Sequence, residues 1–292
     1  MVFLLTSIAV IGSTGVWLIN RWVICHGGRG EVYGFWSAGT SAFVSGCVLL
    51  ALGQLPLQRE VWFIGAMIAV AYAVGYFVVI MHCLRIGPTG PTVAMNNMGM
   101  VWPVVLGALW LKPHPVGNWD AAGLVLVSLS LILFGFSNRQ SQAGGRAQGM
   151  SAAWLSWALL GWLLSGVSLT GQLLGSIHAS NRPVAIVFAL NVLTTLLLAP
   201  AVLRRGSAWY TEREMIGGAL NGVVVAIGNV ALLMALRYIG PEVVFPFTIA
   251  LPIMLVLVLG QFLYREKLPG IGWAASVLGV LGLTGLSLGQ RL

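Results

Sequence analysis

Long apolar runs separated by short polar stretches follow one another along the whole chain. A helix that crosses a bilayer needs about 20 mostly apolar residues, and the intervals between charged residues provide that length repeatedly. The strands of a membrane β-barrel are only about ten residues long and alternate in polarity, so continuous runs favour an all-α membrane protein. The pattern predicts about ten transmembrane helices, at 2–20, 32–53, 61–84, 89–111, 121–137, 150–173, 184–203, 215–236, 243–264 and 268–288.

The composition favours the same class. Of the 292 residues, 58% are hydrophobic and 8% are charged, whereas about a quarter of the residues in an ordinary globular domain are charged. The three cysteines lack the spacing of a disulfide framework or a metal site. A formal charge of +8 without a clustered basic face is usual for a membrane protein with basic loops. We therefore expect a multi-pass protein of the cell membrane, surrounded by lipid, with no metal, no cofactor and no nucleic-acid partner.

The two halves of the sequence resemble each other at an offset of about 153 residues. The segment 84–88 (LRIGP) matches 236–241 (LRYIGP) with one inserted residue, and Gly75 matches Gly228. The offset predicts a first five-helix repeat at 1–137, a linker at 138–149 and a second five-helix repeat at 150–292. Because five is odd, the second half must enter the membrane in the opposite orientation, which makes the repeat inverted. Secondary transporters commonly have this plan.

Prolines mark the fourth and ninth predicted helices. Proline removes a backbone donor and kinks a helix, which lipid tolerates only where the freed carbonyl groups are satisfied or line a cavity. Interrupted helices at matching positions of two halves indicate a binding site near the midplane. An alternative interpretation is that the prolines are packing kinks or helix starts. The first copy has Pro88, Pro91 and Pro103, the second has Pro241, Pro246 and Pro252, and we predict functional kinks at Pro103, Pro246 and Pro252.

Polar and aromatic residues recur at helical spacing on the first, third, fourth, sixth, eighth and ninth predicted helices. Polar side chains inside a membrane segment are costly and usually face the interior of the bundle. Amides, hydroxyls and aromatic rings suit a neutral or zwitterionic solute, although any one of them can instead be an ordinary interhelical hydrogen bond. The predicted substrate-binding residues are Ser13, Trp17, Asn20, Tyr72, Tyr76, Asn96, Asn97, Trp102, Gln172, Asn221, Asn229 and Thr248.

Charged residues bear on coupling and on sidedness. All seven acidic residues fall at the ends of predicted helices or in loops, whereas a proton-driven cation exporter normally keeps a carboxylate at membrane depth. A uniporter or an exchanger is therefore favoured. The odd-numbered loops carry ten Lys or Arg residues, and the even-numbered loops and C-terminus carry five. By the positive-inside rule, both termini face outward.

Two tandem five-helix halves, each with a Gly-Pro pair before its fourth helix, resemble the drug/metabolite transporter superfamily, specifically its EamA-type ten-helix permeases. The closest match is 259–268 (LGQFLYREKL), followed by Gly272 and Gly279, with Glu266 in the position of a common family glutamate. Departures from the family pattern occur at 112–115 (KPHP), where the first half lacks that glutamate, and at 12–15 (GSTG), where members often have Trp-Gly. The resemblance implies a central cavity lined by helices 1, 3, 4, 6, 8 and 9, with helices 5 and 10 peripheral. It also implies cytoplasmic termini, which contradicts the charge count.

Together these patterns predict a secondary transporter or facilitator. We expect it to export a small neutral or zwitterionic metabolite, such as an amino acid, by alternating access, as a monomer or homodimer. We expect no enzymatic activity, because a lipid-acting membrane enzyme needs clustered acids, histidines or metal ligands near one membrane face, and here they are scattered. A structural or sensory membrane subunit is the other alternative, and it leaves the repeat unexplained.

Overall fold

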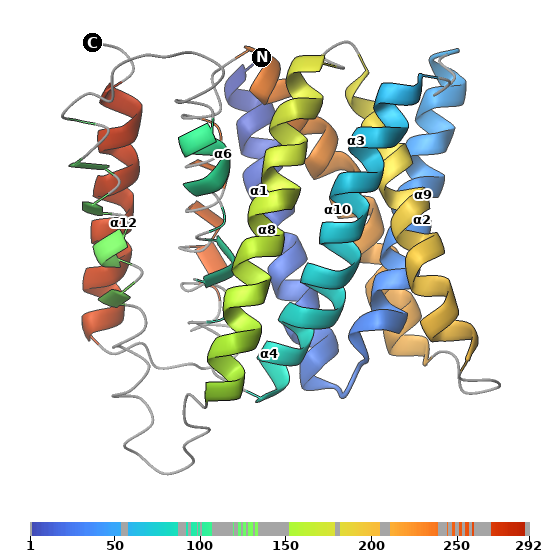
Figure 1. Ribbon diagram of the computed structural model, residues 1–292, viewed down its shortest axis with the longest axis horizontal. Coiled ribbons are helices and arrows are strands. Elements are labelled where there is room, and N and C mark those ends of the chain that lie inside the picture. Colours follow the sequence, from blue (N-terminus) through green and yellow to red (C-terminus); the bar gives the residue numbers. More distant parts are fainter. Residues whose placement is uncertain are drawn as a thin grey trace.

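The computed structural model of the chain is a bundle of long helices lying side by side (Figure 1). It describes residues 2–53, 58–86, 92, 95–97, 99, 101–106, 119, 122–123, 125–126, 128–130, 132–133, 152–178, 182–204, 211–238, 244, 247–248, 251–252, 255–256, 259 and 270–289. Within these residues all regular structure is helical, which confirms the predicted all-α class. The helices are α1 (Val2–Cys25), α2 (Gly30–Ala51), α3 (Arg59–Val70), η1 (Ala71–Ile80), α4 (Met81–Ile86), α6 (Val101–Leu106), α8 (Ala152–His178), α9 (Pro183–Leu203), α10 (Glu212–Tyr238) and α12 (Gly270–Gly289).

Six helical segments of the described chain are long and apolar enough to cross a membrane. They are Leu4–Ile24, Gly30–Ala51, Arg59–Ile86, Ala153–Gly175, Pro183–Leu203 and Glu212–Leu236, and each overlaps one predicted segment. Large apolar side chains such as Ile11, Phe43 and Phe63 are exposed on them, which suits contact with lipid. The predicted helices 89–111, 121–137 and 243–264 are described only in part, and the linker 138–149 falls wholly outside the described residues, so the count of ten and the domain boundaries stay predictions.

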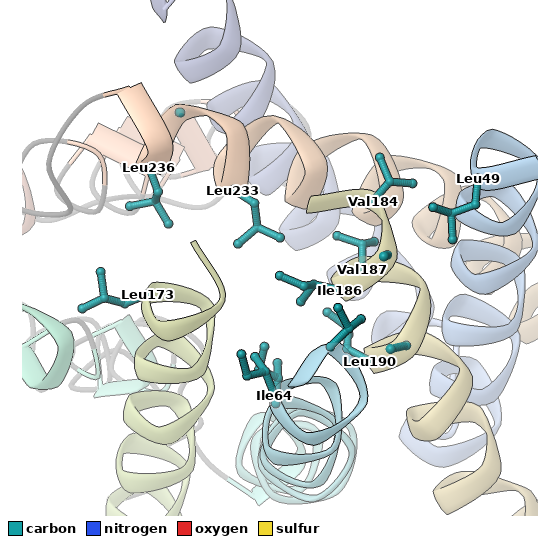
Figure 2. Packing of buried hydrophobic residues seen from close by; sticks show 14 of the residues in the cluster. Leu49, Ile64, Leu173, Val184, Ile186, Val187, Leu190, Leu233 and Leu236 are labelled. Atoms are coloured by element: carbon teal, nitrogen blue, oxygen red, sulfur yellow. The ribbon is translucent and has the colours of Figure 1, made fainter. Parts of the chain in front are cut away.

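Helices from the two sequence halves alternate in the centre of the bundle. α2 packs on α9 and α10, α1 packs on α10, and α3 packs on α8 and α9. Buried leucine, isoleucine and valine side chains fill the space where α2, α3, α8, α9 and α10 meet (Figure 2). The core is therefore shared between the halves, and neither half has a separate core among the described residues.

The two ends of the bundle can be told apart by the connections they hold. The start of α1 and the end of α12 lie at the same end (Figure 1). The connection between α1 and α2, residues 26–29, lies at the opposite end, which we name the α1–α2 end. α12 stands at the edge of the bundle (Figure 1), where Ser130 Oγ donates a hydrogen bond to the carbonyl of Ala275 at 2.6 Å.

α2 approaches its neighbours closely because its buried face is built of small residues, including Gly34, Ser37 and Ser41. A Cβ atom on Gly34 would lie 2.5 Å from the ring of Phe77, and one on Gly218 would lie 2.6 Å from Trp36 Cβ. Such contacts hold membrane helices together, because lipid provides no hydrophobic driving force between them.

The middle of the third predicted helix is a π-helix, η1. The N–H of Met81 bonds to the carbonyl of Tyr76, five residues earlier, where an α-helix uses the carbonyl four residues earlier. A π-helical turn therefore holds one residue more than an α-helical turn. Leu84 follows Gly75 by nine positions, whereas Leu236 follows Gly228 by eight. The first half carries an additional residue in this stretch, and η1 accommodates it, whereas the corresponding part of α10 is α-helical.

Candidate functional site

A cavity of about 170 Å³ lies between helices of both sequence halves. The stretches that line it fall near the middle of α1, α8, α10 and the continuous segment from α3 to α4, so the cavity lies at mid-depth in the bundle. An engineered cavity of roughly 150 Å³ binds one benzene molecule. A cavity of this size therefore suits a small organic molecule. Its lining is Gly12, Ser13, Val16, Trp17, Ala71, Tyr72, Gly75, Tyr76, Asn96, Asn97, Ser165, Ser168, Leu169, Gln172, Val224, Val225, Gly228, Asn229, Leu232, Thr248 and Pro252.

Nine of the twelve predicted substrate-binding residues line this cavity, and so does the predicted kink residue Pro252. Helical spacing within separate segments therefore selected faces that converge in space. The contact of these side chains with a substrate stays a prediction. The nine are Ser13, Trp17, Tyr72, Tyr76, Asn96, Asn97, Gln172, Asn229 and Thr248.

Three aromatic rings form one wall of the cavity, which we name the aromatic wall: Trp17, Tyr72 and Tyr76. The Tyr72 and Tyr76 rings are stacked, with centroids 5.3 Å apart and planes at 11°. Trp17 meets Tyr76 edge to face at 5.7 Å. Each such ring pair contributes about 0.5–1.5 kcal/mol beyond the burial of area. The wall is thus a mutually supported apolar surface.

Amides and hydroxyls make up the polar part of the lining. The Nδ2 atom of Asn97 and the Oε1 atom of Gln172 are buried, and neither has a hydrogen-bond partner among the described residues. An unsatisfied buried polar atom costs about 1–3 kcal/mol. Asn97 and Gln172 both line the cavity, so one donor and one acceptor without a partner in the described chain lie beside it.

The chemistry available at the cavity is hydrogen bonding and ring contact. The described lining contains amides, hydroxyls, aromatic rings and aliphatic side chains, and no acidic or basic side chain is among them. The described chain also contains no group of three His, Cys, Asp or Glu residues arranged to hold a metal ion. Such a lining can hold and orient a small molecule through Asn97, Gln172 and the aromatic wall.

Asn20 lies outside the cavity, although it shares a helix face with Ser13 and Trp17. Its side chain is 1% exposed, its Nδ2 donates to the hydroxyl of Tyr76, and its Oδ1 accepts from the hydroxyl of Tyr33 at 2.5 Å. Helical spacing predicts a face but not its depth, and Asn20 lies about one turn closer to the α1–α2 end than Trp17.

Asn221, Trp102 and Pro103 also lie away from the cavity lining. Asn221 is fully buried, and its Nδ2 donates to Ser37 Oγ at 2.7 Å across the α10–α2 contact. Asn221 therefore has the role that the sequence analysis gave as the alternative to substrate binding, an ordinary interhelical hydrogen bond. The ring of Trp102 packs against Trp162 of α8, with centroids 5.4 Å apart, and Pro103 is buried beside it on α6. Pro246 lies outside the described residues.

The selection of site residues by polarity missed the glycines of the lining. A Cβ atom on Gly12 would lie 3.2 Å from the Cα atom of Gly228, so α1 and α10 meet there backbone to backbone. The spacing of polar side chains cannot predict a cavity lining made of glycine backbone. Ser165 and Ser168, whose spacing in the sequence places them on one helix face with Gln172, also line the cavity.

A buried ion pair joins the two halves at the α1–α2 end. Glu214 is 1% exposed and accepts hydrogen bonds from the backbone N, Nε and Nη2 of Arg29 at 2.8, 2.9 and 3.1 Å. The hydrogen bond with Glu214 raises the pKa of Arg29 above its ordinary value, so this guanidinium stays charged. Thr211 N donates to Glu214 Oε2 at 2.9 Å, and Glu214 N donates to Thr211 Oγ1 at 3.3 Å. This reciprocal pair is a capping box, which fixes the start of α10.

No family model matches the chain, and no curated protein matches it. A solved structure, described only as the crystal structure of a protein, is 16% identical to this chain and superposes on it with a TM-score of 0.73. The similarity covers 98% of this chain and 99% of the other. The chain therefore shares its fold with a known structure along nearly its whole length.

Proposed function

We propose that this protein is a secondary transporter or facilitator that exports a small neutral or zwitterionic metabolite, such as an amino acid, across the cell membrane by alternating access. The observation that carries the proposal is the mid-depth cavity, lined by polar and aromatic side chains from both halves. Polar residues at membrane depth are costly, and they typically mark a substrate pathway. Transporters built from repeats bind their substrates near the midplane, between the repeats.

The size and chemistry of the cavity support a small zwitterion. Drug-sized ligands occupy pockets of about 300–1,000 Å³, whereas this cavity is about 170 Å³. The free acceptor of Gln172 suits an ammonium group, and the free donor of Asn97 suits a carboxylate. The aromatic wall would hold the apolar part of the same molecule.

Contacts between α2, α3, α9 and α10 support a two-fold relation between the halves, as expected for an inverted repeat of the kind that many secondary transporters have. A Cβ atom on Gly65 would lie 2.9 Å from Ala189 Cβ, and one on Gly218 would lie 2.6 Å from Trp36 Cβ. At an offset of 153, Gly65 corresponds to Gly218 and Trp36 corresponds to Ala189. The contact that the first half makes with the second through Gly65 is therefore repeated by the second half with the first through Gly218. Inverted copies related by a pseudo-two-fold axis produce such an exchange.

A second pair of corresponding contacts joins α8 to α3 and α10 to α1. A Cβ atom on Gly175 would lie 3.4 Å from the side chain of Ile64, and one on Gly217 would lie 3.2 Å from the ring of Trp22. The same offset of 153 relates Trp22 to Gly175 and Ile64 to Gly217. Two unrelated helix pairs thus support one symmetry.

We further propose that the chain is an EamA-type member of the drug/metabolite transporter superfamily. The cavity draws its lining from the first, third, fourth, sixth, eighth and ninth predicted helices, as that resemblance implies. The peripheral position of α12, which Ser130 of the fifth predicted helix contacts, agrees with it as well. Of the segment 259–268, which carries the closest resemblance, only Leu259 is among the described residues.

Transport can be tested directly with proteoliposomes loaded with a mixed pool of amino acids, amines, nucleosides and sugars. Efflux is read by mass spectrometry with and without a pH gradient, and protein-free liposomes serve as the control. We expect selective loss of small zwitterions, with little dependence on the gradient. Retention of every solute under both conditions, by protein shown to be folded and inserted, would contradict the proposal.

We expect Gln172→Leu to lower efflux and yet to stabilise the fold. The substitution removes a buried oxygen without a partner among the described residues, which relieves about 1 kcal/mol. Loss of one hydrogen bond to the substrate should slow efflux about tenfold. The melting temperature in detergent and the initial rate in proteoliposomes measure the two effects.

The matched control for this variant is Asn191→Leu on α9. Asn191 is a fully buried amide, and its Oδ1, like the Oε1 of Gln172, has no partner among the described residues, but it is not part of the cavity lining. We expect this control to leave the KM of efflux unchanged. Equal loss of efflux in both variants would show that Gln172 has no special contact with the substrate.

A further inference from the structure

Asn20 and Tyr33 form a hydrogen-bonded pair directly behind the aromatic wall. The hydroxyl of Tyr33 on α2 donates to Asn20 Oδ1 at 2.5 Å, and Asn20 Nδ2 on α1 donates to the hydroxyl of Tyr76 on η1. Tyr33 is fully buried and Asn20 is 1% exposed, and neither lines the cavity. Two consecutive hydrogen bonds thus connect α2, α1 and η1, and the second one ends at the hydroxyl of the lining residue Tyr76.

We propose that Asn20 and Tyr33 are positioning residues, which set the affinity of the cavity by holding the Tyr76 ring in place without touching the substrate. This inference rests on the proposed function. The ring of Tyr76 is the central member of the aromatic wall, because Trp17 contacts one side of it and Tyr72 is stacked on it. A shift of this ring would therefore change the whole wall.

Tyr76 needs support that an ordinary helix residue does not. It lies within η1, where its carbonyl accepts from the N–H of Met81 in the wide π-helical pattern. π-helical segments are rare, because their geometry is poorer than that of an α-helix, and they occur frequently at functional sites. The hydrogen bond from Asn20 adds a side-chain constraint to this π-helical backbone.

The second half of the chain does not build this network. At the offset of 153, Leu173 and Ile186 take the places of Asn20 and Tyr33, and Asn229 takes the place of Tyr76. Leu173 and Ile186 both belong to the apolar cluster shown in Figure 2. The first half therefore provides a held aromatic wall, the second provides an amide at the matching position, and a ligand meets two chemically different sides.

Tyr33→Phe tests the inference, because it removes one hydroxyl and keeps the ring that packs on Phe77 with centroids 6.0 Å apart. The matched control is Ser37→Ala, one turn further along α2. Ser37 is 1% exposed, and its Oγ accepts a hydrogen bond from Asn221, so the control removes a comparable interhelical bond away from the cavity. The full chain is used throughout, with the solute identified by the efflux experiment as the transport probe.

Two readouts separate positioning from simple structural support. We expect Tyr33→Phe to raise the KM of efflux about tenfold, with the maximal rate within about twofold, and Ser37→Ala to change neither. Hydrogen exchange of the peptide that covers 71–80, followed by mass spectrometry in detergent, should become faster in Tyr33→Phe alone. Asn20→Leu, which copies the residue of the second half, should have both effects as well.

The outcomes distinguish this inference from the proposed function. If Tyr33→Phe and Ser37→Ala change the KM and the exchange of 71–80 alike, the pair is ordinary interhelical support and the inference is overturned. If no solute leaves the proteoliposomes, the proposed function fails, and the exchange experiment decides alone. Faster exchange of 71–80 in Tyr33→Phe only would then support the positioning of Tyr76, and unchanged exchange would overturn it.

Discussion

Glu214→Ala is expected to destabilise the fold by about 3 kcal/mol, because it breaks a buried ion pair by removing one partner. Glu214 is 1% exposed and receives three hydrogen bonds from Arg29 and one from Thr211. Without the carboxylate, the Arg29 guanidinium and the Thr211 N–H lose these partners. The Arg29 side chain is 25% exposed, and water can reach part of it, which keeps the estimate at the lower end of the usual range of about 3–5 kcal/mol.

Thermal unfolding of the purified chain in detergent measures this effect, and Glu212→Ala is the matched control. Glu212 is in the same first turn of α10 but is exposed, so its removal changes the charge at the helix start without opening a buried contact. We expect the control to cost a few tenths of a kcal/mol through the helix dipole. Equal losses in both variants would show that the charge at the start of α10 matters and the ion pair does not.

Replacing both Arg29 and Glu214 tests whether the unpaired charge of Arg29 causes the loss of stability in Glu214→Ala. The double variant Arg29→Met with Glu214→Leu leaves no buried charge, and apolar replacements of buried ion pairs are often neutral or stabilising. We therefore expect the double variant to be more stable than Glu214→Ala. This pairing was not predictable from the sequence, because Arg29 and Glu214 are 185 positions apart and each reads locally as an ordinary loop or helix-end charge.

The predicted helix faces converged on the cavity because a membrane imposes two simple constraints. A segment of lipid-crossing length must be helical, and polar side chains on it are driven inward. These constraints gave correct segments for α1, α2, α8, α9 and α10, with ends displaced by a few residues. They also brought Ser13 and Trp17 together with Gln172, which lies far away in the sequence.

The same constraints do not determine depth along a helix or the partner of each polar group. Asn221 and Asn229 lie on one helix, yet Asn229 lines the cavity whereas Asn221 bonds to Ser37 on α2. Their surroundings are set by which neighbouring helix lies opposite, and that is tertiary information. Asn20 shows the same limit within α1, where a correct face extends past the end of the cavity.

The π-helix η1 corresponds to a feature of the sequence that the pattern of polar and apolar residues does not show. The interval from Gly75 to Leu84 is one residue longer than the interval from Gly228 to Leu236. A count of positions between repeat landmarks therefore detects the additional residue, although it does not say whether a bulge, a loop or a π-helix absorbs it. The apolar surroundings favour a helical solution over a loop, because a loop at membrane depth would leave backbone groups without hydrogen bonds.

Gly222→Ala is expected to destabilise the fold by about 2–3 kcal/mol through overpacking. A Cβ atom there would overlap the carbonyl oxygen of Ser37 and lie 2.7 Å from Thr40 Cβ and 2.9 Å from the backbone N of Ser41. The first and last of these atoms belong to the backbone of α2, so α10 has to move away from α2 to make room. The sign is diagnostic, because alanine in place of a helical glycine ordinarily stabilises by about 1 kcal/mol.

The matched control is Gly39→Ala, within α2 itself. The nearest atom to a Cβ there is a methyl group of Thr195 at 3.9 Å, so we expect the usual small stabilisation or no change. Melting temperatures in detergent compare the two variants, and similar values for both would refute the close approach of α10 and α2. Separation of these helices should also move Tyr33, which is one turn from Ser37, away from Asn20. We therefore expect Gly222→Ala to raise the KM of efflux as Tyr33→Phe does, which would couple the central helix contact to the wall of the cavity.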